Sequence, residues 1–171
     1  MGPIRIMNGN DAILLIEDDP GDVLLIKLAF EHLEVPCRLV CVSDGLEALE
    51  YLNGQEQYSD RVKFPFPRLI LLDLRMPRMD GFEFLQWLRV APLLRSLPVI
   101  VITSSALSQD VTRAYRAGAN SFLVKSPDLS RFTQELKQTL SFWLGENEIH
   151  GPSITTNTWP DADIPPVDSN S

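Results

Sequence analysis

Side chains that could do chemistry stand at the carboxyl ends of four apolar runs in this 171-residue chain. They are Glu17-Asp18-Asp19 after the first run, Asp73 after the third, Thr103-Ser104 after the fourth and Lys125 after the fifth. Clustered carboxylates repel one another, and a divalent cation that prefers oxygen ligands, such as Mg²⁺, relieves that repulsion. A carboxylate can also attack phosphorus, and an ammonium group can pair with phosphoryl oxygens. These residue types are those of a metal-assisted phosphoryl-transfer site, if the fold brings the run ends together.

Each of these residues also has an ordinary structural explanation. Asp19 precedes a proline and is favoured as a helix cap. Asp18 is favoured as a metal ligand because Asp73 supplies a companion carboxylate. Asp73 ends a wholly apolar strand, where an unpaired charge is costly, so it is expected to be paired or solvated. Thr103 taken alone would be an ordinary strand-end hydroxyl. Lys125 differs from the usual solvated lysine because it ends a short buried run and faces the acidic group.

The elements that must position these residues alternate along the chain. Continuous apolar runs predict strands covered on both faces, and the amphipathic stretches between them predict helices. The expected strands span 12–16, 37–42, 69–73, 98–103 and 121–124. The expected helices span 20–33, a segment that follows 43–45 and stops near 54, a segment opened by a capping box at 80–83, then 107–117 and 128–144. This order predicts an α/β fold with a doubly wound, five-stranded parallel sheet, whose crevice lies beyond the carboxyl ends of the strands.

The chain divides by composition into three parts. Residues 1–11 form a short leader and residues 12–144 the folded domain, within which 55–68 is a polar loop interrupted by prolines. Residues 145–171 contain five acidic residues, four prolines and no Lys or Arg, so we expect a disordered or loosely docked acidic tail.

Charge and hydropathy exclude several classes of function. The net charge of −8 argues against nonspecific binding to nucleic acid, which needs a basic face. The chain has no apolar run near the length that spans a bilayer, and its first residues do not resemble a signal peptide. A cytoplasmic location is therefore expected, with no membrane and no nucleic acid among the partners.

Two cysteines, Cys37 and Cys41, lie four residues apart in one predicted strand. Their Cα atoms would be about 13 Å apart in an extended chain, and a disulfide needs less than about 7 Å. We expect free thiols or small buried side chains, since two ligands alone would make a poor zinc site.

The sequence around Asp73 resembles the response-regulator receiver family of two-component signalling. Leu71-Leu72-Asp73-Leu74-Arg75-Met76-Pro77-Arg78-Met79-Asp80-Gly81 carries the most specific part of the likeness. Glu17-Asp18, Thr103 and Lys125 follow the right strands in the right order, and the resemblance extends over 12–144. It implies the flavodoxin-like (βα)5 receiver fold. Ile16-Glu17-Asp18-Asp19-Pro20-Gly21-Asp22 and the long loop before the third strand are similar to the stand-alone receivers that partner phytochromes.

The resemblance implies a role for each acidic residue. Asp73 would accept the phosphoryl group from a phosphohistidine of a sensor histidine kinase. Asp18 would bind Mg²⁺ directly and Glu17 through water, while Asp73 and the backbone carbonyl of Arg75 would complete the protein ligands. Positioning and charge neutralisation account for most of such chemistry.

The remaining family positions concern the response to phosphorylation. Thr103 and Lys125 would contact the transferred group, and Phe122 would follow Thr103 inward as the aromatic switch residue. Phe122 stands where a tyrosine is commoner, so the switch would act by packing. The family usually places proline after the lysine with a cis bond, whereas here Ser126 intervenes before Pro127. Either a strained cis bond is tolerated or the loop is trans and displaces Lys125 slightly.

No further catalytic or DNA-binding domain is expected after the receiver, so output would occur by protein contact or by onward phosphoryl transfer in a relay. The last helix places an apolar stripe at helical spacing on its core face: Leu129, Phe132, Leu136, Leu140 and Trp143. Phe142 lies off this stripe and could belong to a homodimer face formed by the last two helices and the strand between them.

Three alternatives differ in class. A phosphohydrolase of the haloacid-dehalogenase type would carry Asp-x-Asp at its nucleophile. Here the second aspartate is missing, because position 75 is Arg. A nucleotide- or flavin-binding fold needs a backbone cradle for phosphate, which the acidic loop 17–22 lacks. A pseudo-receiver that acts only as a binding module remains open, because Ser126 stands where the family usually has proline.

A receiver would not be an enzyme in the usual sense, since it promotes only its own phosphorylation and dephosphorylation.

Overall fold

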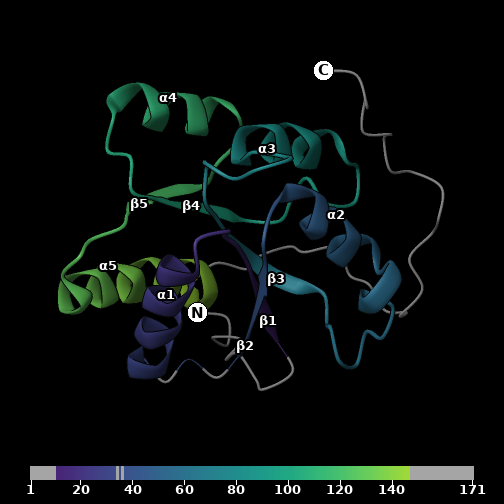
Figure 1. Cartoon of the computed structure of the whole chain (residues 1–171), viewed down its shortest axis with the longest axis horizontal. Helices are drawn as coiled ribbons and strands as arrows, with labels where there is room; N and C mark the ends of the chain where they lie inside the picture. Colours follow the sequence, from purple (N-terminus) through teal and green to yellow (C-terminus); the bar gives the residue numbers. More distant parts are fainter. Residues whose placement is uncertain (1–10, 34, 36, 147–171) are drawn as a thin grey trace.

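A computed structural model describes residues 11–33, 35 and 37–146, and within these residues the chain forms one parallel sheet (Figure 1). The strand order is β2-β1-β3-β4-β5, the doubly wound arrangement that the alternation of elements predicted. The strands are β1 (Ala12–Ile16), β2 (Arg38–Val42), β3 (Pro67–Leu72), β4 (Val99–Thr103) and β5 (Ser121–Val124). All neighbouring pairs are parallel, so their carboxyl ends meet at one edge.

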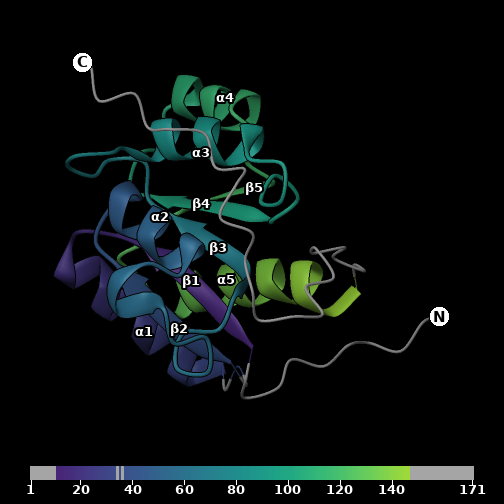
Figure 2. The same cartoon turned by 90° about the vertical axis from the view of Figure 1, so that its right-hand side faces the viewer.

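Helices cover both faces of the sheet (Figures 1 and 2). Helices α1 and α5 lie on one face, and α2, α3 and α4 lie on the other. Their bounds are α1 (Pro20–Leu33), α2 (Gly45–Asn53), α3 (Gly81–Val90), α4 (Ser108–Arg116) and α5 (Leu129–Ser141). No helix among the described residues has the length and apolar character needed to cross a bilayer.

The two faces of the sheet each have an apolar core, which explains the unbroken apolar runs. Ile13 and Leu15 pack with α1 and α5, while Leu14 and Ile16 pack with α2 and α3. All four are at most 1% exposed. Alternate side chains of a strand point to opposite faces, so a strand between two helical layers must be apolar throughout.

The predicted stripe of α5 is confirmed as a core face. Phe132 and Leu136 are 0% exposed, and Leu129 and Trp143 pack against the same cluster. Burial of such side chains stabilises the fold by about 2 kcal/mol each. Phe142 is 51% exposed, as its position off the stripe predicted.

Local signals placed most helix ends correctly. Asp80 and Glu83 form the predicted capping box at the start of α3. Asp19 caps α1 as expected, because its Oδ1 accepts hydrogen bonds from the amides of Gly21 and Asp22. Gly54 follows α2 with φ +64°, a left-handed conformation that glycine adopts at low cost.

Several element boundaries differ from the sequence predictions by one to three residues. Strand β3 begins at Pro67 rather than 69, which is possible because the first residue of a strand need not donate to the ladder. Helix α5 ends at Ser141, and the chain continues as a π turn over Phe142–Glu146. The loop before β3 contains a short 3₁₀ turn, Glu56–Tyr58, although its prolines argued against regular structure.

Both cysteines are free thiols in the described part of the chain, as their spacing predicted. The predicted leader and acidic tail lie outside the described residues, apart from Asp11 and the two residues that end the π turn. The domain limits 12–144 therefore stay a prediction.

Candidate functional site

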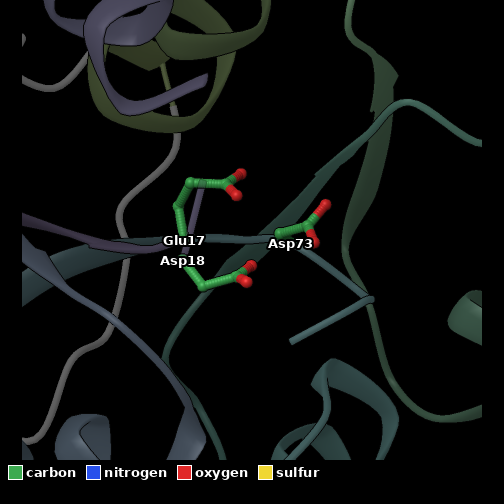
Figure 3. A group of neighbouring side chains, drawn as sticks. All are labelled: Glu17, Asp18 and Asp73. Carbon is green, nitrogen blue, oxygen red and sulfur yellow. The ribbon is translucent and has the colours of Figure 1, made fainter. Parts of the chain in front are cut away.

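The carboxyl edge of the sheet gathers the acidic residues that the sequence singled out. Glu17 and Asp18 follow β1, Asp73 follows β3, and a carboxylate oxygen from each lies within 4.8 Å of the others. Figure 3 shows the Glu17 and Asp18 carboxylates both turned toward the side on which Asp73 lies. Glu17 and Asp73 are 4% and 5% exposed, while Asp18 is exposed to solvent.

Backbone hydrogen bonds continue the sheet by one residue beyond the strands and so fix these side chains. The amide of Glu17 donates to the carbonyl of Val42 at 3.0 Å, and the amide of Asp73 donates to the carbonyl of Ile16 at 3.0 Å. The amide of Lys125 donates to the carbonyl of Thr103 at 2.9 Å. The site residues are thus part of the rigid sheet rather than of free loops.

The Lys125 ammonium group lies among three carboxylates. Its Nζ is 2.5 Å from Glu17 Oε2, 2.6 Å from Asp22 Oδ2 and 3.2 Å from Asp73 Oδ1. Its side chain is only 6% exposed. The peptide bond to Ser126 is trans, as are all others in the described segments, so of the two possibilities for this loop the trans form is found. Even so, Lys125 reaches the acidic cluster.

Burial and charge act in opposite directions on this group. Burial alone would lower the pKa of Lys125, but its hydrogen bonds to Asp22 and Glu17 and the charge of Asp73 outweigh burial and raise it. Burial raises the pKa of Glu17, and the neighbouring Asp73 adds to that effect despite the hydrogen bond from Lys125. Four carboxylates, those of Glu17, Asp18, Asp22 and Asp73, thus lie around one ammonium group, an arrangement that attracts a further cation.

The loop after Asp73 is shaped around its carboxylate. The amide of Arg75 donates to Asp73 Oδ2 at 2.9 Å, so Lys125 and Arg75 bind different oxygens of the nucleophile candidate. Gly81 begins α3 directly against the backbone of this strand end, where a Cβ atom would collide with the Asp73 carbonyl. Glycine after Asp80 is thus required by the close approach of α3 to the site.

The two switch candidates occupy neighbouring strands. Thr103 ends β4 and is 1% exposed, and its Oγ1 accepts a long hydrogen bond of 3.4 Å from the amide of Ser105. Phe122 on β5 pairs with Val101 on β4 and is half-buried against the core on the α2 and α3 side. Thr103 thus lies at the carboxyl edge of the sheet, and Phe122 lies on the neighbouring strand two residues before that strand ends.

The acidic cluster is chemically suited to a divalent cation. Glu17, Asp18 and Asp73 each offer a carboxylate oxygen, and hard oxygen ligands are those that Mg²⁺ prefers. The exposed carboxylate of Asp18 leaves one side open to water, which Mg²⁺ keeps in its coordination sphere. The predicted carbonyl ligand from Arg75 stays a prediction.

The sequence reasoning missed Asp22 as a site residue. It lies in the first turn of α1, whose start faces the crevice, and it binds Lys125 as closely as Glu17 does. A signal was present, because the helix after the first strand starts at the carboxyl edge and an acidic residue in its first turn must lie nearby.

Comparison with known proteins agrees with this geometry. Residues 13–137 match the response regulator receiver domain. The chain is 40% identical over 144 residues to the probable methanogenesis regulatory protein FilR2 of Methanothrix harundinacea, which covers 82% of this chain and 88% of FilR2. It is 35% identical over 137 residues to the response regulator Rcp1 of Synechocystis sp., which covers 80% of this chain and 91% of Rcp1.

Solved structures of receivers superpose on the described fold. The phosphorylated cyanobacterial phytochrome response regulator RcpA matches with a TM-score of 0.70 and 36% identity, over 78% of this chain and 94% of RcpA. The Mn²⁺-bound form of Rcp1 matches with a TM-score of 0.70 and 34% identity, over 80% of this chain and 96% of Rcp1.

These findings define the class of protein. The chain belongs to the response regulator receiver family. More particularly, it is a receiver with the flavodoxin-like fold, homologous to single-domain response regulators such as Rcp1, and its function is phosphorelay signalling. The phosphohydrolase and nucleotide-binding alternatives find no support in these comparisons.

Proposed function

We propose that Asp73 is the phosphoacceptor and that its donor is the phosphohistidine of a sensor histidine kinase. The observation that carries the proposal is the position of the Asp73 carboxylate, which is bound by Lys125 and by the Arg75 amide beside an acidic cluster. In the reaction, an oxygen of Asp73 forms a bond to phosphorus while the P–N bond of the phosphohistidine breaks. The imidazole leaves with the electron pair and takes a proton from solvent.

The surrounding residues neutralise and orient charge. Lys125 lies 3.2 Å from Asp73 Oδ1 and provides a positive charge for the phosphoryl oxygens. Glu17, Asp18, Asp73 and the carbonyl of Arg75 would hold Mg²⁺, which when bound supplies charge neutralisation for phosphoryl transfer. The magnesium ion in the active site cleft of the PA1611 receiver domain and the Mn²⁺-bound form of Rcp1 support a divalent cation here.

Thr103 and Phe122 provide the route from chemistry to signal in this proposal. The Thr103 hydroxyl, at the end of β4, turns to donate to a phosphoryl oxygen. Phe122 then moves into the space beneath α4, and the surface formed by α4 and β5 changes shape. The half-buried state of Phe122 supports this role, because the side chain can become more buried.

The partner that supplies the phosphoryl group is proposed to be a phytochrome-type sensor kinase in the cytoplasm. The likeness to RcpA, a phytochrome response regulator, supports this choice. Output passes to a protein partner or to a further phosphotransfer protein, and the receiver catalyses no reaction beyond its own phosphorylation and dephosphorylation.

A homodimer through α4, β5 and α5 is proposed for the signalling form. Exposed Phe142 at the end of α5 and Tyr115 on α4, which are 51% and 49% exposed, supply aromatic surface for it. Sedimentation at tens of micromolar tests it: a monomer with and without phosphorylation would contradict the proposal.

The proposed phosphoacceptor is tested by intact-mass spectrometry after incubation with acetyl phosphate and Mg²⁺. The wild type should gain one phosphoryl group in a Mg²⁺-dependent way, and Asp73→Asn should gain none. If the wild type gains none from acetyl phosphate or from a phosphorylated kinase, the chain is a binding module of the pseudo-receiver type instead.

A further inference from the structure

Three side chains connect the β3–α3 loop, which follows Asp73, with the β4–α4 loop, which follows Thr103. The carboxylate of Asp110, in the first turn of α4, accepts a hydrogen bond of 2.6 Å from the Ser105 hydroxyl. The same oxygen, Oδ2, lies 3.3 Å from Nη2 of Arg75. We call Arg75, Ser105 and Asp110 the Asp110 clasp. It ties the β3–α3 loop to the β4–α4 loop and to α4.

Each end of the Asp110 clasp is one hydrogen bond away from a proposed site residue. The amide of Arg75 donates to Asp73 Oδ2 at 2.9 Å. The amide of Ser105 donates to Thr103 Oγ1 at 3.4 Å. Asp110 is thus placed between the phosphoacceptor candidate and the switch hydroxyl, although it is part of neither the acidic cluster nor the sheet.

The residues of the Asp110 clasp differ in their exposure to solvent. Asp110 is shielded, with a side chain 15% exposed, whereas the Arg75 side chain is 71% exposed. Arg75 and Asp110 both line a groove of about 340 Å³ beside α4, so the guanidinium group borders open space rather than packed core. The hydrogen bond from Ser105 holds the pKa of Asp110 below its usual range, so the carboxylate is charged at neutral pH. Arg75 can therefore move while Asp110 and Ser105 stay together.

Phosphorylation changes which anion attracts Arg75 most strongly. A carboxylate carries one negative charge, whereas a phosphoryl group carries about −1.5 to −2 and offers three acceptor oxygens. Arginine prefers to bind such a group through two parallel hydrogen bonds. Arg75 is only two residues from Asp73, and its own amide already binds that carboxylate. Lys125 binds the opposite oxygen of Asp73, so it does not occupy the place that Arg75 would take.

We infer that Asp110 is a positioning residue that holds the β4–α4 loop in the unphosphorylated state through Arg75, and that Arg75 leaves it for the phosphoryl group on Asp73. This inference rests on the proposed function, because it needs a phosphoryl group at Asp73. The release of Arg75 removes one of the ties between α4 and the β3–α3 loop. The loop that carries Ser105 and follows Thr103 is then free to move toward the phosphoryl group.

Hydrogen–deuterium exchange of the full chain tests the inference, with and without Mg²⁺ and beryllofluoride, which mimics the phosphoryl group. In the wild type, beryllofluoride should speed exchange in peptides covering 104–116 by about two- to fivefold, the effect of losing one exposed charged contact. Asp110→Asn should show this faster exchange without beryllofluoride and little further change with it. Asp110→Glu, which keeps the charge, should restore slow exchange.

A matched control and a double variant separate the Asp110 clasp from general loosening of the fold. Glu135→Gln removes the exposed pair between Arg131 and Glu135 on α5, and it should leave exchange over 104–116 unchanged. Arg75→Ala combined with Asp110→Asn should exchange no faster than either single variant, because both remove the same contact. Additive effects of the two changes on the exchange rate would overturn the inference. It would also be overturned if Asp110→Asn exchanged over 104–116 at the same rate as the wild type.

Failure of the proposed function would look different from failure of the inference. If intact-mass spectrometry shows no uptake of a phosphoryl group by the wild type, the phosphoacceptor proposal fails and the inference is overturned with it. If the wild type is phosphorylated at Asp73 but exchange over 104–116 does not change, the inference alone is overturned.

Discussion

On the β1 and β5 side of the site, the Lys125 side chain is 6% exposed and its ammonium group binds Glu17 and Asp22 at 2.5 and 2.6 Å. On the β4 side, Arg75 is 71% exposed and lies 3.3 Å from Asp110. Both sides are held by ion pairs, but the two pairs of Lys125 are short and largely buried, whereas the pair of Arg75 is long and open to solvent. Buried pairs are costly to break, whereas exposed pairs contribute little.

This contrast indicates a division of labour between the two sides. The buried side fixes the groups that must be in place before phosphoryl transfer, since positioning accounts for most of such chemistry. The exposed side can exchange partners at small cost, which a signalling element requires. Substitutions on the buried side should therefore have larger effects on stability than substitutions of exposed residues.

The largest effect is expected from Lys125→Met. This change leaves Glu17 and Asp73 buried beside each other without a cation, and it should lower the free energy of unfolding by about 3 kcal/mol. The loss is not larger because Asp22 is partly exposed and can turn toward solvent. Urea denaturation in metal-free buffer measures the loss, and millimolar Mg²⁺ should restore part of it. Unchanged stability without metal would show that the acidic cluster does not depend on Lys125.

A smaller loss of stability is expected from Asp44→Ala. The Asp44 carboxylate is 1% exposed, caps α2 through the amide of Glu47 and binds the guanidinium group of Arg78 in the β3–α3 loop. Loss of the cap and of a charged hydrogen bond should cost about 2 kcal/mol. Thermal or urea denaturation checks this value, and Asp44→Asn, which keeps the cap, should lose less. Equal losses in the two variants would contradict the capping account.

Substitution of Asp18, the exposed candidate metal ligand, should weaken Mg²⁺ binding without destabilising the fold. Asp18→Asn should weaken Mg²⁺ binding by more than about tenfold, since even outer-shell partners of metals are worth that much. Its urea midpoint in metal-free buffer should equal or exceed that of the wild type, because Asp18 is exposed and the loss of its charge relieves repulsion within the acidic cluster. Calorimetric titration with Mg²⁺ measures the affinity. An unchanged affinity would remove Asp18 from the ligand set.

The last prediction concerns the opposite end of the sheet, away from the acidic cluster. Burial raises the pKa of the Cys37 thiol to about 11, and the nearby Asp11 adds to that effect. The thiol is therefore mostly protonated below that pH, and the reactive thiolate is only a small fraction at pH 8. At pH 8 its alkylation by iodoacetamide should be about 100-fold slower than in the urea-unfolded chain, as measured by peptide mass spectrometry. Equal rates in the folded and unfolded chain would show that Cys37 is not shielded.

The strands and the buried side of the site were predictable from sequence because both depend on short-range patterns. Leu14, Leu71 and Val101 lie in apolar runs that only a two-sided sheet explains, and the charged residues that follow such runs must meet at one edge. Asp73 and Lys125 were found in this way, although 52 residues separate them.

The exposed side was not predictable because it depends on how two loops are oriented. Asp110 gave no signal, since an acidic residue in the first turn of a helix is ordinary. Its partner Arg75 is 35 residues away and was considered only for its backbone carbonyl. Asp22 differs from Asp110, because its place in the first turn of the helix after β1 put it near the crevice, and only its contact with Lys125 depends on the direction of the side chain.

The central claim is that the phosphoryl group enters the buried side of the site at Asp73. Reduction of the phosphorylated protein with borohydride converts an aspartyl phosphate to homoserine, and tandem mass spectrometry of peptides covering 12–22 and 69–80 locates it. We predict homoserine at position 73 after treatment with acetyl phosphate and Mg²⁺, and none when Mg²⁺ is omitted. Homoserine at Asp18 or Asp80, or its absence from a protein that has gained a phosphoryl group, would contradict the claim.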